Sequence, residues 1–429
     1  MIEQVPHDLK DDEHVEVLNL YMNPKFSPIF AKINEEYLYW DKVKYLAPEG
    51  ISNRHLWFAV KLQRSARMQR LSFGGYNFYF NVTPSMYCLL HEFDLNMGGN
   101  ISSNSIIPDK DKQLYLISSL MEEAIASSQM EGASTTRVVA KEMLRKQESP
   151  VNKSQQMIVN NYNTIRELVE RKVERLDMAL LLDVHKSISF RTLENPQDEG
   201  RIRQSDDVYV VDAITGEVAH TPPTHSDIEH ILMDLFAFAN RGKDDEFIHP
   251  IVKGIIIHFV MAWIHPFVDG NGRTARSLVY WYLLKKDYWL TEYLSISRVI
   301  YNNKSRYERA FLQTEADGMD MTYFILYNLQ VMKQAIEDLR KYLARKMEER
   351  RTIQQYAGMD GLSERQMYIL HLYDETPSLL LTAVDVANRY GVTEKTARID
   401  LQALVAIGKL TKIALNKKKS GYVQMRDNS

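Results

Sequence analysis

Apolar residues recur at three- and four-residue steps along most of this 429-residue chain, and the alternation typical of strands is confined to short stretches. The helical pattern covers the longest segments, at residues 53–68, 108–148, 151–173, 176–190, 251–264, 305–312 and 321–353. Aromatic and β-branched residues predict strands at residues 76–82 and in two short runs between 208 and 221. The pattern therefore predicts a mainly α-helical protein.

Changes in composition divide the chain into four segments. The first 28 residues or so are polar and predict a partly ordered arm, and a glycine and serine cluster at residues 98–105 is a candidate boundary. One apolar stripe on a highly charged helix is typical of a connector, and its residues are Met332, Ile336, Leu339, Leu343 and Met347. The expected segments are an N-terminal arm and α/β extension (1–105), a central helical domain (106–330), a helical connector (331–358) and a C-terminal domain (359–429).

The C-terminal domain has an order of elements that resembles a winged helix-turn-helix. Its signals are capped helix starts at 363–366 and 382–385, a turn at 390–393, a third helix at 393–407, and two strands at 408–412 and 421–423 around lysines 417–419. In such a domain the third helix enters the major groove of DNA. Lys395, Arg398 and Gln402 face outward on that helix, but Glu394 and Asp400 share it, so DNA binding and protein docking both stay open.

A predicted β-hairpin interrupts the central helical domain. Its strands are residues 217–221 and, before the turn, Val208, Tyr209, Val210 and Val211. A lone hairpin that covers little core indicates a binding role. The spacing of Ser226 to Glu229 is that of a capping box and predicts the start of another helix.

A helix break is expected at residues 132–136. Gly132 suits the left-handed residue that closes a helix, and Ser134 to Thr136 can cap the next one. Taken by themselves, Ser127 and Glu131 are ordinary solvated residues near a helix end, where acidic side chains are disfavoured but common.

Polar chemistry is concentrated in one loop between two buried helical segments. Residues 251–264 are nearly all apolar, residues 277–284 resume that character, and between them lies His265-Pro266-Phe267-Val268-Asp269-Gly270-Asn271-Gly272-Arg273-Thr274-Ala275-Arg276. A loop held by two buried helices is fixed by its scaffold and still reachable from solvent.

Each polar group of this loop has a property that a triphosphate site needs. Gly270 to Gly272 let backbone amides at a helix start approach an anion, and Asp269 offers a hard oxygen ligand for Mg²⁺. Arg273 and Arg276 share a helix face and can clamp a diphosphate, while His265 supplies a general base that titrates near neutral pH. Singly, each residue has a structural explanation; together they predict a nucleotide site.

Composition narrows the classes of protein and of site. The chain is 45% hydrophobic with a net charge of −3, so it can bury sizeable cores and has no overall attraction to nucleic acid or membranes. Its single cysteine, Cys88, excludes an intramolecular disulfide and a zinc site built on cysteine pairs, and it suits a cytoplasmic location. The polar N-terminus predicts no signal peptide, and the longest apolar run is too short to span a bilayer.

The run from His265 to Arg276 resembles the signature of the Fic (Fic/Doc) family, His-x-Phe-x-Asp/Glu-Gly-Asn-Gly-Arg-x-x-Arg, at every specified position. The resemblance extends over roughly residues 110–330. It implies a Fic-type helical core in which His185 and His258 are structural and in which Phe267 packs inward. The C-terminal winged helix is similar to a common bacterial companion of this domain.

The resemblance implies transfer of AMP from ATP to a Ser, Thr or Tyr hydroxyl of a target protein, with pyrophosphate as the leaving group. In the implied roles His265 removes the proton and Asp269 binds Mg²⁺. Gly270, Asn271 and Gly272 would seat the α- and β-phosphates. Arg273 would bind the phosphate chain and Arg276 the γ-phosphate. The predicted hairpin corresponds to the family's flap, which pairs with the target's backbone as an added strand.

A second family motif, the inhibitory sequence Ser/Thr-x-x-x-Glu-Gly/Asn, matches Ser127-x-x-x-Glu131-Gly132, and this replaces the interpretation of a solvated helix end. The resemblance implies that Glu131 pairs with Arg276 and withholds it from the γ-phosphate. A pair that costs a few kcal/mol to break would repress the reaction by about tenfold to a thousandfold.

One position departs from the family pattern. Many relatives carry two adjacent tyrosines that line the purine pocket, and here Tyr307 is followed by Glu308, which leaves the preference for adenine open. Two other functions also stay open: removal of AMP from a modified protein, in which the inhibitory glutamate activates water, and a DNA-bound regulator whose Fic domain senses nucleotide. The oligomeric state, a homodimer included, is not specified.

Overall fold

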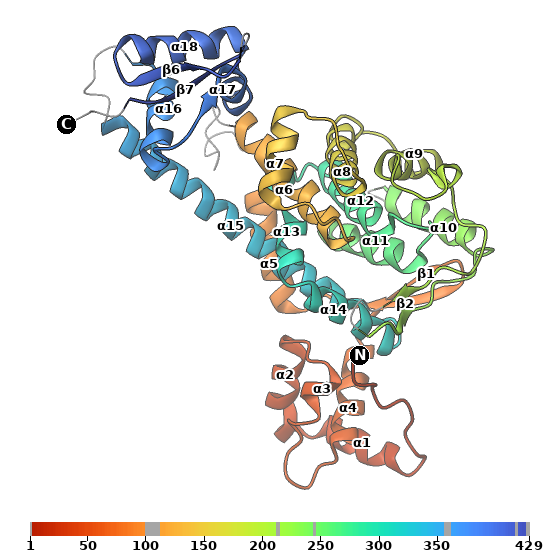
Figure 1. The fold of residues 1–429 in the computed structure, drawn as a ribbon. Helices are drawn as coiled ribbons and strands as arrows, with labels where there is room; N and C mark the ends of the chain where they lie inside the picture. Colours follow the sequence, from red (N-terminus) through yellow and green to blue (C-terminus); the bar gives the residue numbers. More distant parts are fainter. Residues whose placement is uncertain are drawn as a thin grey trace.

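The computed structural model describes residues 2–98, 112–211, 215–242, 246–355, 362–416 and 419–425. It is mainly helical, with small antiparallel sheets, as the hydrophobic pattern predicts. Three bodies follow one another in Figure 1: a small helical unit at the N-terminus, a large helical body, and a C-terminal unit at the far end of one long helix. No helix in these ranges is long and apolar enough to cross a bilayer.

The N-terminal unit has a core of its own. Its helices are α1 (Glu13–Met22), α2 (Ser27–Glu35), α3 (Trp40–Val43) and α4 (Asn53–Ser65). The expectation of a partly ordered arm is wrong, because Val17 and Leu20 fall on one face of α1 and are buried in the cluster that contains Trp57. The helix expected at residues 53–68 is α4.

A β-hairpin and one helix lead from this unit into the large body. They are β1 (Gln69–Phe73), β2 (Tyr76–Phe80) and α5 (Pro84–Met97). The strand expected at residues 76–82 is β2, whereas β1 has polar residues at its outward positions and gave no strand signal. The hairpin packs on the large body through Phe78 and Trp263, whose ring centroids are 5.1 Å apart.

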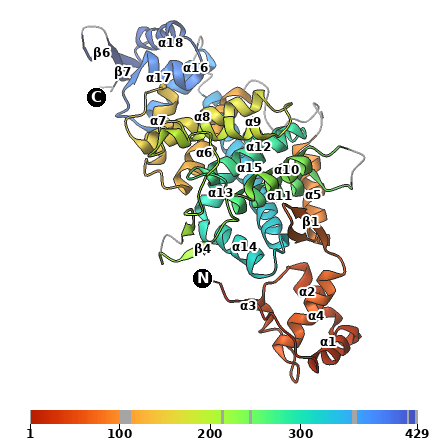
Figure 2. The same ribbon diagram turned by 90° about the vertical axis from the view of Figure 1, so that its right-hand side faces the viewer.

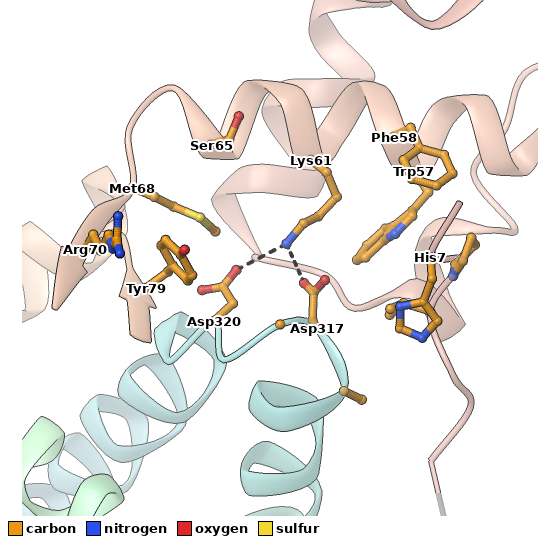
Figure 3. Close-up of a pocket in the computed structure, with 14 residues that line it drawn as sticks. His7, Trp57, Phe58, Lys61, Ser65, Met68, Arg70, Tyr79, Asp317 and Asp320 are labelled. Atoms are coloured by element: carbon orange, nitrogen blue, oxygen red, sulfur yellow. Dashed lines mark hydrogen bonds and ion pairs between the residues drawn. The ribbon is translucent and has the colours of Figure 1, made fainter. Parts of the chain in front are cut away.

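A cavity of about 440 Å³ lies between the N-terminal unit and the loop that follows α14 (Lys304–Ala316). Figure 3 shows Lys61 reaching across this boundary to the buried carboxylates of Asp317 and Asp320, at 2.9 and 3.8 Å. Arg64 is buried beside it and donates to the hydroxyl of Tyr323. These ionic contacts fix the N-terminal unit on the large body.

The large body is built around two central helices. Besides α14, its helices are α6 (Lys112–Met130), α7 (Arg137–Lys146), α8 (Lys153–Glu170), α9 (Met178–Ser189), α10 (Ile228–Asn240), α11 (Pro250–Ile264), α12 (Asn271–Lys285), α13 (Ile296–Asn302) and α15 (Thr322–Gln355). Figure 2 shows α11 and α12 side by side in the middle of this body. α11 is buried on all sides, as its uniformly apolar sequence predicts, and Gly254 lets α12 approach closely. The helix break expected at residues 132–136 is the junction between α6 and α7.

The start of α10 differs from the expected capping box at residues 226–229. The helix begins at Ile228, and Asp227 makes no side-chain cap. The carboxylate of Asp227 instead accepts a hydrogen bond from the hydroxyl of Tyr76, at 2.9 Å. A tertiary contact with the β1–β2 hairpin has therefore replaced the local cap.

The boundary expected at residue 330 is wrong, because it falls inside the continuous helix α15. α15 belongs to the core of the large body as far as Leu343, and Met332, Ile336, Leu339 and Leu343 are all buried there. Further along the helix Met347 is 44% exposed. Figure 1 shows the last part of α15 leaving the large body and reaching the C-terminal unit, so only this part connects the two.

The C-terminal unit has three helices and a three-stranded sheet of order β5-β7-β6. Its elements are α16 (Glu364–Glu375), β5 (Leu381–Thr382), α17 (Ala383–Tyr390), α18 (Glu394–Ala406), β6 (Leu410–Ala414) and β7 (Ser420–Gln424). The capping boxes expected at Ser363 and Thr382 are both present. The strand β5 was not predicted because it has two residues only, and residues 417–418 of the expected lysine tip lie outside the described ranges.

Candidate active site

The loop between α11 and α12 is held in shape by its own residues. The side chain of Asn271 accepts a hydrogen bond from the backbone N–H of Phe267 at 2.9 Å and donates to its carbonyl at 2.8 Å. The ring of Phe267 is fully buried and stacks on His185, with centroids 3.6 Å apart. The side chain of Asn271 therefore holds the loop in shape from within.

His185 fixes the loop from a neighbouring helix. Its Nδ1 accepts a hydrogen bond from the N–H of Gly200 at 3.0 Å, so its Nε2 carries the proton that is donated to the carbonyl of Asp269 at 2.9 Å. Burial lowers the pKa of His185 to about 4, which keeps the ring neutral. The expectation of a hydrogen-bonded core histidine is confirmed.

His265 closes α11 in the left-handed conformation, with φ of 49° and ψ of 59°. Its Nδ1 lies 3.3 Å from the carbonyl of Ala262, which can only accept, so the proton is on Nδ1 and Nε2 is free to accept another. Burial is the largest influence and lowers the pKa of His265 to about 4, and the neighbouring His220 and Arg203 act in the same direction. The ring is thus a neutral base that keeps partial access to solvent.

The first turn of α12 presents the groups expected to bind phosphate. Gly270 precedes it with a φ of 85°, and the first amides of a helix have no acceptor within it. The side chain of Arg273 is fully buried; its Nη1 donates to the carbonyl of Ile188, but Nε and Nη2 have no hydrogen-bond partner in the described part of the chain. Asp269 lies 3.6 Å from Nη2, with 45% of its side chain exposed.

Arg276 faces the end of α6 and is engaged there. Its Nη2 donates to Glu131 Oε1 at 2.8 Å and to the carbonyl of Ser127 at 2.9 Å, and its Nε donates to Ser127 Oγ at 2.9 Å. Burial raises the pKa of Glu131, but the charge and hydrogen bond of Arg276 outweigh it, so that the net pKa is lowered. The expected contact between Glu131 and Arg276 is confirmed.

Two glycines make this contact fit. Gly132, with a φ of 91°, turns the chain directly after Glu131, as expected. Gly272 lies beneath the carboxylate of Glu131, and a Cβ at Gly272 would clash with it. The carboxylate of Glu131 therefore rests on the N-terminus of α12, at the place where an anion is favoured.

Other contacts hold α6 against α13 and α14. Glu123 is buried, and its carboxylate accepts hydrogen bonds from the backbone N–H and the hydroxyl of Ser297 at the start of α13. Lys304 donates to the carbonyl of Met130 at 3.2 Å, and the side chain of Met130 belongs to a cluster that includes Tyr307. The hydroxyl of Tyr307 lies 3.2 Å from Nε2 of His258, and both residues are close enough to Arg276 to feel its charge.

The hairpin is shorter than expected. β3 (Val210–Val211) pairs with β4 (Val218–His220), whereas Val208 and Tyr209 precede the strand. The turn is expected at residues 212–216, of which residues 212–214 lie outside the described ranges. Tyr209 and Val211 are about half exposed, as a docking edge requires. At the end of β4, His220 Nε2 donates to the carbonyl of Trp263, at 2.7 Å, near the end of α11.

Arg203 contacts both the hairpin segment and the catalytic loop, and the sequence did not single it out. Its guanidinium donates to the carbonyls of His265 and Ser205, at 3.1 and 2.7 Å. Arg203 is one of several arginines before the hairpin, and acceptors on distant backbone leave no signal in the sequence.

A comparison with models of protein families finds a match in this part of the chain. The family model described as Fic/DOC matches residues 175–283, which run from just before α9 to the last turn of α12 and include the whole loop and hairpin. The chain contains a Fic/DOC domain. The hairpin β3–β4 is accordingly called the flap below.

Curated relatives match over the same part of the chain. "Protein adenylyltransferase Fic" from Nematostella vectensis is 35% identical over 109 residues, which cover 25% of this chain and 23% of that protein. The protein of the same name from Drosophila melanogaster is 30% identical over 118 residues, which cover 27% of this chain and 22% of that protein. The chain thus spans less than a quarter of the length of these relatives.

Solved structures match over more of the chain at lower identity. A Fic family protein from Desulfovibrio desulfuricans G20 is 18% identical, with 81% of this chain and 98% of that chain covered and a TM-score of 0.49. Fic-1 (residues 134–508) from C. elegans is 14% identical, with 78% and 88% covered and a TM-score of 0.48.

Proposed function

We propose that the chain is a protein adenylyltransferase that transfers AMP from ATP to a Ser, Thr or Tyr hydroxyl of a target protein. The observation that carries this proposal is the buried guanidinium of Arg273 at the N-terminus of α12, directly after the loop that begins at the neutral base His265: in the described residues Nε and Nη2 make no hydrogen bond, and Nη2 has only the half-exposed Asp269 nearby. A buried cation with unused donors is costly unless an anion completes it, and phosphate oxygens fit such a fork. The likeness of residues 175–283 to proteins named adenylyltransferase supports the same function.

In the proposed reaction His265 Nε2 takes the proton of the target hydroxyl as its oxygen attacks the α-phosphorus. A new oxygen–phosphorus bond forms, the bond from the α-phosphorus to the oxygen of the β-phosphate breaks, and pyrophosphate leaves. The first amides of α12 seat the α- and β-phosphates, and Arg273 binds the phosphate chain. The neutral state of His265 suits this role, because a protonated ring could not accept the hydroxyl proton.

Asp269 is the residue proposed to hold Mg²⁺. Its carboxylate is 45% exposed beside the N-terminus of α12, and Mg²⁺ is commonly bound through one or two carboxylates, water and substrate phosphates. The described residues contain no group of three or more His, Cys, Asp or Glu side chains placed to hold a metal, which fits a site completed by the nucleotide. Bound Mg²⁺ supplies positive charge against the phosphate oxygens.

The structure of the α6 end supports an inhibited state. Glu131 occupies the N-terminus of α12 and engages Arg276, which we assign to the γ-phosphate. Three hydrogen bonds to Glu131 and Ser127 must give way before that phosphate can bind Arg276. Inhibition then follows from competition between two anions, the carboxylate of Glu131 and the γ-phosphate, for the same donors.

The flap is proposed to position the target. The exposed residues Val208, Tyr209 and Val211, together with Val210, offer a short edge to which an extended segment of the target can add as a strand. Backbone pairing of this kind fixes register without a particular target sequence. It brings one hydroxyl to His265 and keeps the neighbouring side chains outside.

ATP labelled in its α-phosphate tests the reaction type. The Glu131→Gly variant should transfer this label to protein, whereas ATP labelled in its γ-phosphate should transfer none. His265→Ala in the same background should lose at least about a hundredfold in rate, because general-base catalysis contributes that much. Transfer of the γ-label, or release of AMP from a pre-modified protein without any incorporation, would contradict the proposal.

We further infer that the C-terminal unit is a winged helix-turn-helix domain that binds DNA. The sheet order β5-β7-β6 and the turn between α17 and α18 are those of such a domain, and α18 lies on the outer face of the molecule in Figure 1. Exposed cations lie on α18 and on or next to β6, namely Lys395, Arg398, Lys409 and Lys412. Asp400 of α18 is turned inward and pairs with Arg365.

Gel shifts of the full chain with duplex DNA test this inference. Affinity should fall steeply with salt, and Lys395→Glu with Arg398→Glu should abolish binding, because phosphate contacts are lost. Lys32→Glu, an exposed change on α2, should leave binding unchanged. Affinity that is flat across salt, or unaffected by the two changes on α18, would point to a protein partner instead.

A further inference from the structure

Arg203 is the most heavily bonded cation near the proposed active site. Only 1% of its side chain is exposed, and its guanidinium donates to the carbonyls of His265, Ser205 and Pro223 and to the carboxylate of Asp206. Its backbone N–H donates in addition to the carbonyl of Pro266 at 2.9 Å. One residue thus makes five hydrogen bonds to groups far apart in the sequence.

The acceptors fall into two groups. The carbonyls of His265 and Pro266 belong to the catalytic loop, while Ser205 and Pro223 lie just before and just after the flap. Arg203 therefore closes the base of the flap and ties that base to the backbone of the catalytic histidine. This one residue couples the base of the flap to the backbone of His265.

The contact also bears on the conformation of His265. A residue other than glycine at a φ of 49° is in a strained backbone conformation, so its surroundings must stabilise it. The carbonyl that Arg203 binds is at the C-terminus of α11, where unpaired carbonyls and the helix dipole favour a cation. The guanidinium of Arg203 supplies this positive charge, and its hydrogen bond to the carbonyl of His265 stabilises the conformation of that residue.

A second anchor acts on the other strand of the flap. His220, the last residue of β4, donates from Nε2 to the carbonyl of Trp263, and its Nδ1 lies 2.5 Å from the carboxylate of Glu315 on α14. Both strands of the flap are therefore attached to the last turn of α11 and the loop that follows it.

We propose that Arg203 is a positioning residue that holds the flap in register with the Nε2 of His265. The proposal rests on the proposed function only in that the target hydroxyl arrives on the flap. The planar guanidinium is essential because it donates in several directions at once, whereas a lysine in its place has one nitrogen for the same four acceptors. Nucleotide binding uses α12 and is outside this arrangement.

Hydrogen–deuterium exchange of the full chain tests the arrangement without any enzymatic assay. In Arg203→Lys and Arg203→Met, exchange should rise at least about tenfold at residues 204–211, 215–223 and 265–270 and stay unchanged in α8 and α12. Arg201→Met is the matched control, since Arg201 is exposed two residues earlier, and it should exchange like the parent. Unchanged exchange in Arg203→Lys would overturn the proposal, and this conservative variant decides if Arg203→Met does not fold.

Activity separates positioning from a general loss of structure. In the Glu131→Gly background, Arg203→Lys should lose about a hundredfold in AMP incorporation into the proteins of a cell lysate, since a misplacement of about 1 Å can cost that much. Its dissociation constant for a non-hydrolysable ATP analogue with Mg²⁺ should change by less than about threefold. Loss of nucleotide binding together with activity would show a merely structural role. If no variant transfers AMP, the proposed function fails while the exchange result still stands.

Discussion

Three buried histidines, His185, His258 and His265, share one property: burial keeps them neutral. The pKa values of His185 and His265 are lowered to about 4 and that of His258 to about 3, with burial as the largest cause in each. In His185 and His258 this neutrality serves hydrogen bonds that hold the loop and Tyr307. In His265 it leaves one ring nitrogen free for a proton.

The pH dependence of the proposed AMP transfer follows from the low pKa of His265. The reaction needs the neutral ring, so the rate is constant above the pKa and falls as the pH drops through about 4. Between about pH 7.5 and about pH 5.5, Glu131→Gly should lose little activity, whereas a base with the usual histidine pKa of about 6.5 would lose about tenfold. Initial rates at a fixed concentration of ATP and Mg²⁺ measure this, and a tenfold loss would mean that the ring titrates normally.

Ser127 should contribute less to inhibition than Glu131. Ser127→Ala removes the hydrogen bond from Arg276 to the hydroxyl of residue 127. The hydrogen bonds from Arg276 to the backbone carbonyl of residue 127 and to Glu131 stay in place. We expect labelling by α-labelled ATP to rise about fivefold, which corresponds to about 1 kcal/mol for one hydrogen bond. Ser128→Ala is the control, because the hydroxyl of Ser128 donates to the carbonyl of Met157 instead. A larger rise in the control than in Ser127→Ala would show that helix loosening, and not Arg276, sets the rate.

At the scale of elements, α6 is held by more than its last turn. Glu123, two turns before Glu131, joins α6 to the start of α13 through Ser297. Burial raises the pKa of Glu123, and the hydrogen bonds from Ser297, the charge of Arg276 and the hydroxyl of Ser295 offset this in part. The contact between Glu131 and Arg276 therefore depends on how α6 is docked as well as on Glu131.

Glu123→Gln should weaken this docking. The amide group presents donors where the carboxylate accepted two hydrogen bonds, so exchange of backbone amides in α6 and α13 should increase and AMP labelling should rise several-fold, to about tenfold. Glu122→Gln is the control, since Glu122 pairs with Arg137 and Lys141 on α7 and makes no contact with α13 in the described residues. Faster exchange with unchanged labelling would separate the docking of α6 from inhibition.

Sequence alone predicts the elements whose chemistry is local. Residues 265–276 were recognisable because a base, a carboxylate, glycines and arginines share one short loop, and α11 because it is apolar throughout. The contact between Glu131 and Arg276 spans 145 residues and became visible only through a family motif. Arg203 and Glu123 were missed because their partners are distant, and β1 and β5 because a half-exposed strand and a two-residue strand have no clear periodicity.

At the scale of the whole molecule, α14 joins the parts of the chain. Lys304 near its start contacts the end of α6, Tyr307 contacts α11 through His258, and Glu315 near its end contacts the flap. Directly after α14, Asp317 pairs with Lys61 of the N-terminal unit. The N-terminal unit is therefore attached directly after the helix that contacts both the end of α6 and the flap.

Lys61→Met should destabilise this attachment. The carboxylates of Asp317 and Asp320 are almost fully buried, and removal of Lys61 leaves only the nearby guanidinium of Arg64, among the described residues, to compensate their charge. Because Lys61 is itself 26% exposed, we expect a loss of about 2 kcal/mol and an unfolding temperature lower by about 5 °C. Lys32→Met, on the exposed side of α2, is the control. An unchanged unfolding temperature would show that the contact does not hold the two bodies together.

The central claim is that Arg276 is contested between Glu131 and the γ-phosphate of ATP. The most direct test measures AMP incorporation from α-labelled ATP and Mg²⁺ by the parent chain, by Glu131→Gly, and by Glu142→Gly as a control for glycine in a neighbouring helix. Labelling by Glu131→Gly should exceed that of the parent by about tenfold to a thousandfold, and Glu142→Gly should match the parent. Equal labelling by the parent and Glu131→Gly, with AMP transfer present in both, would contradict it.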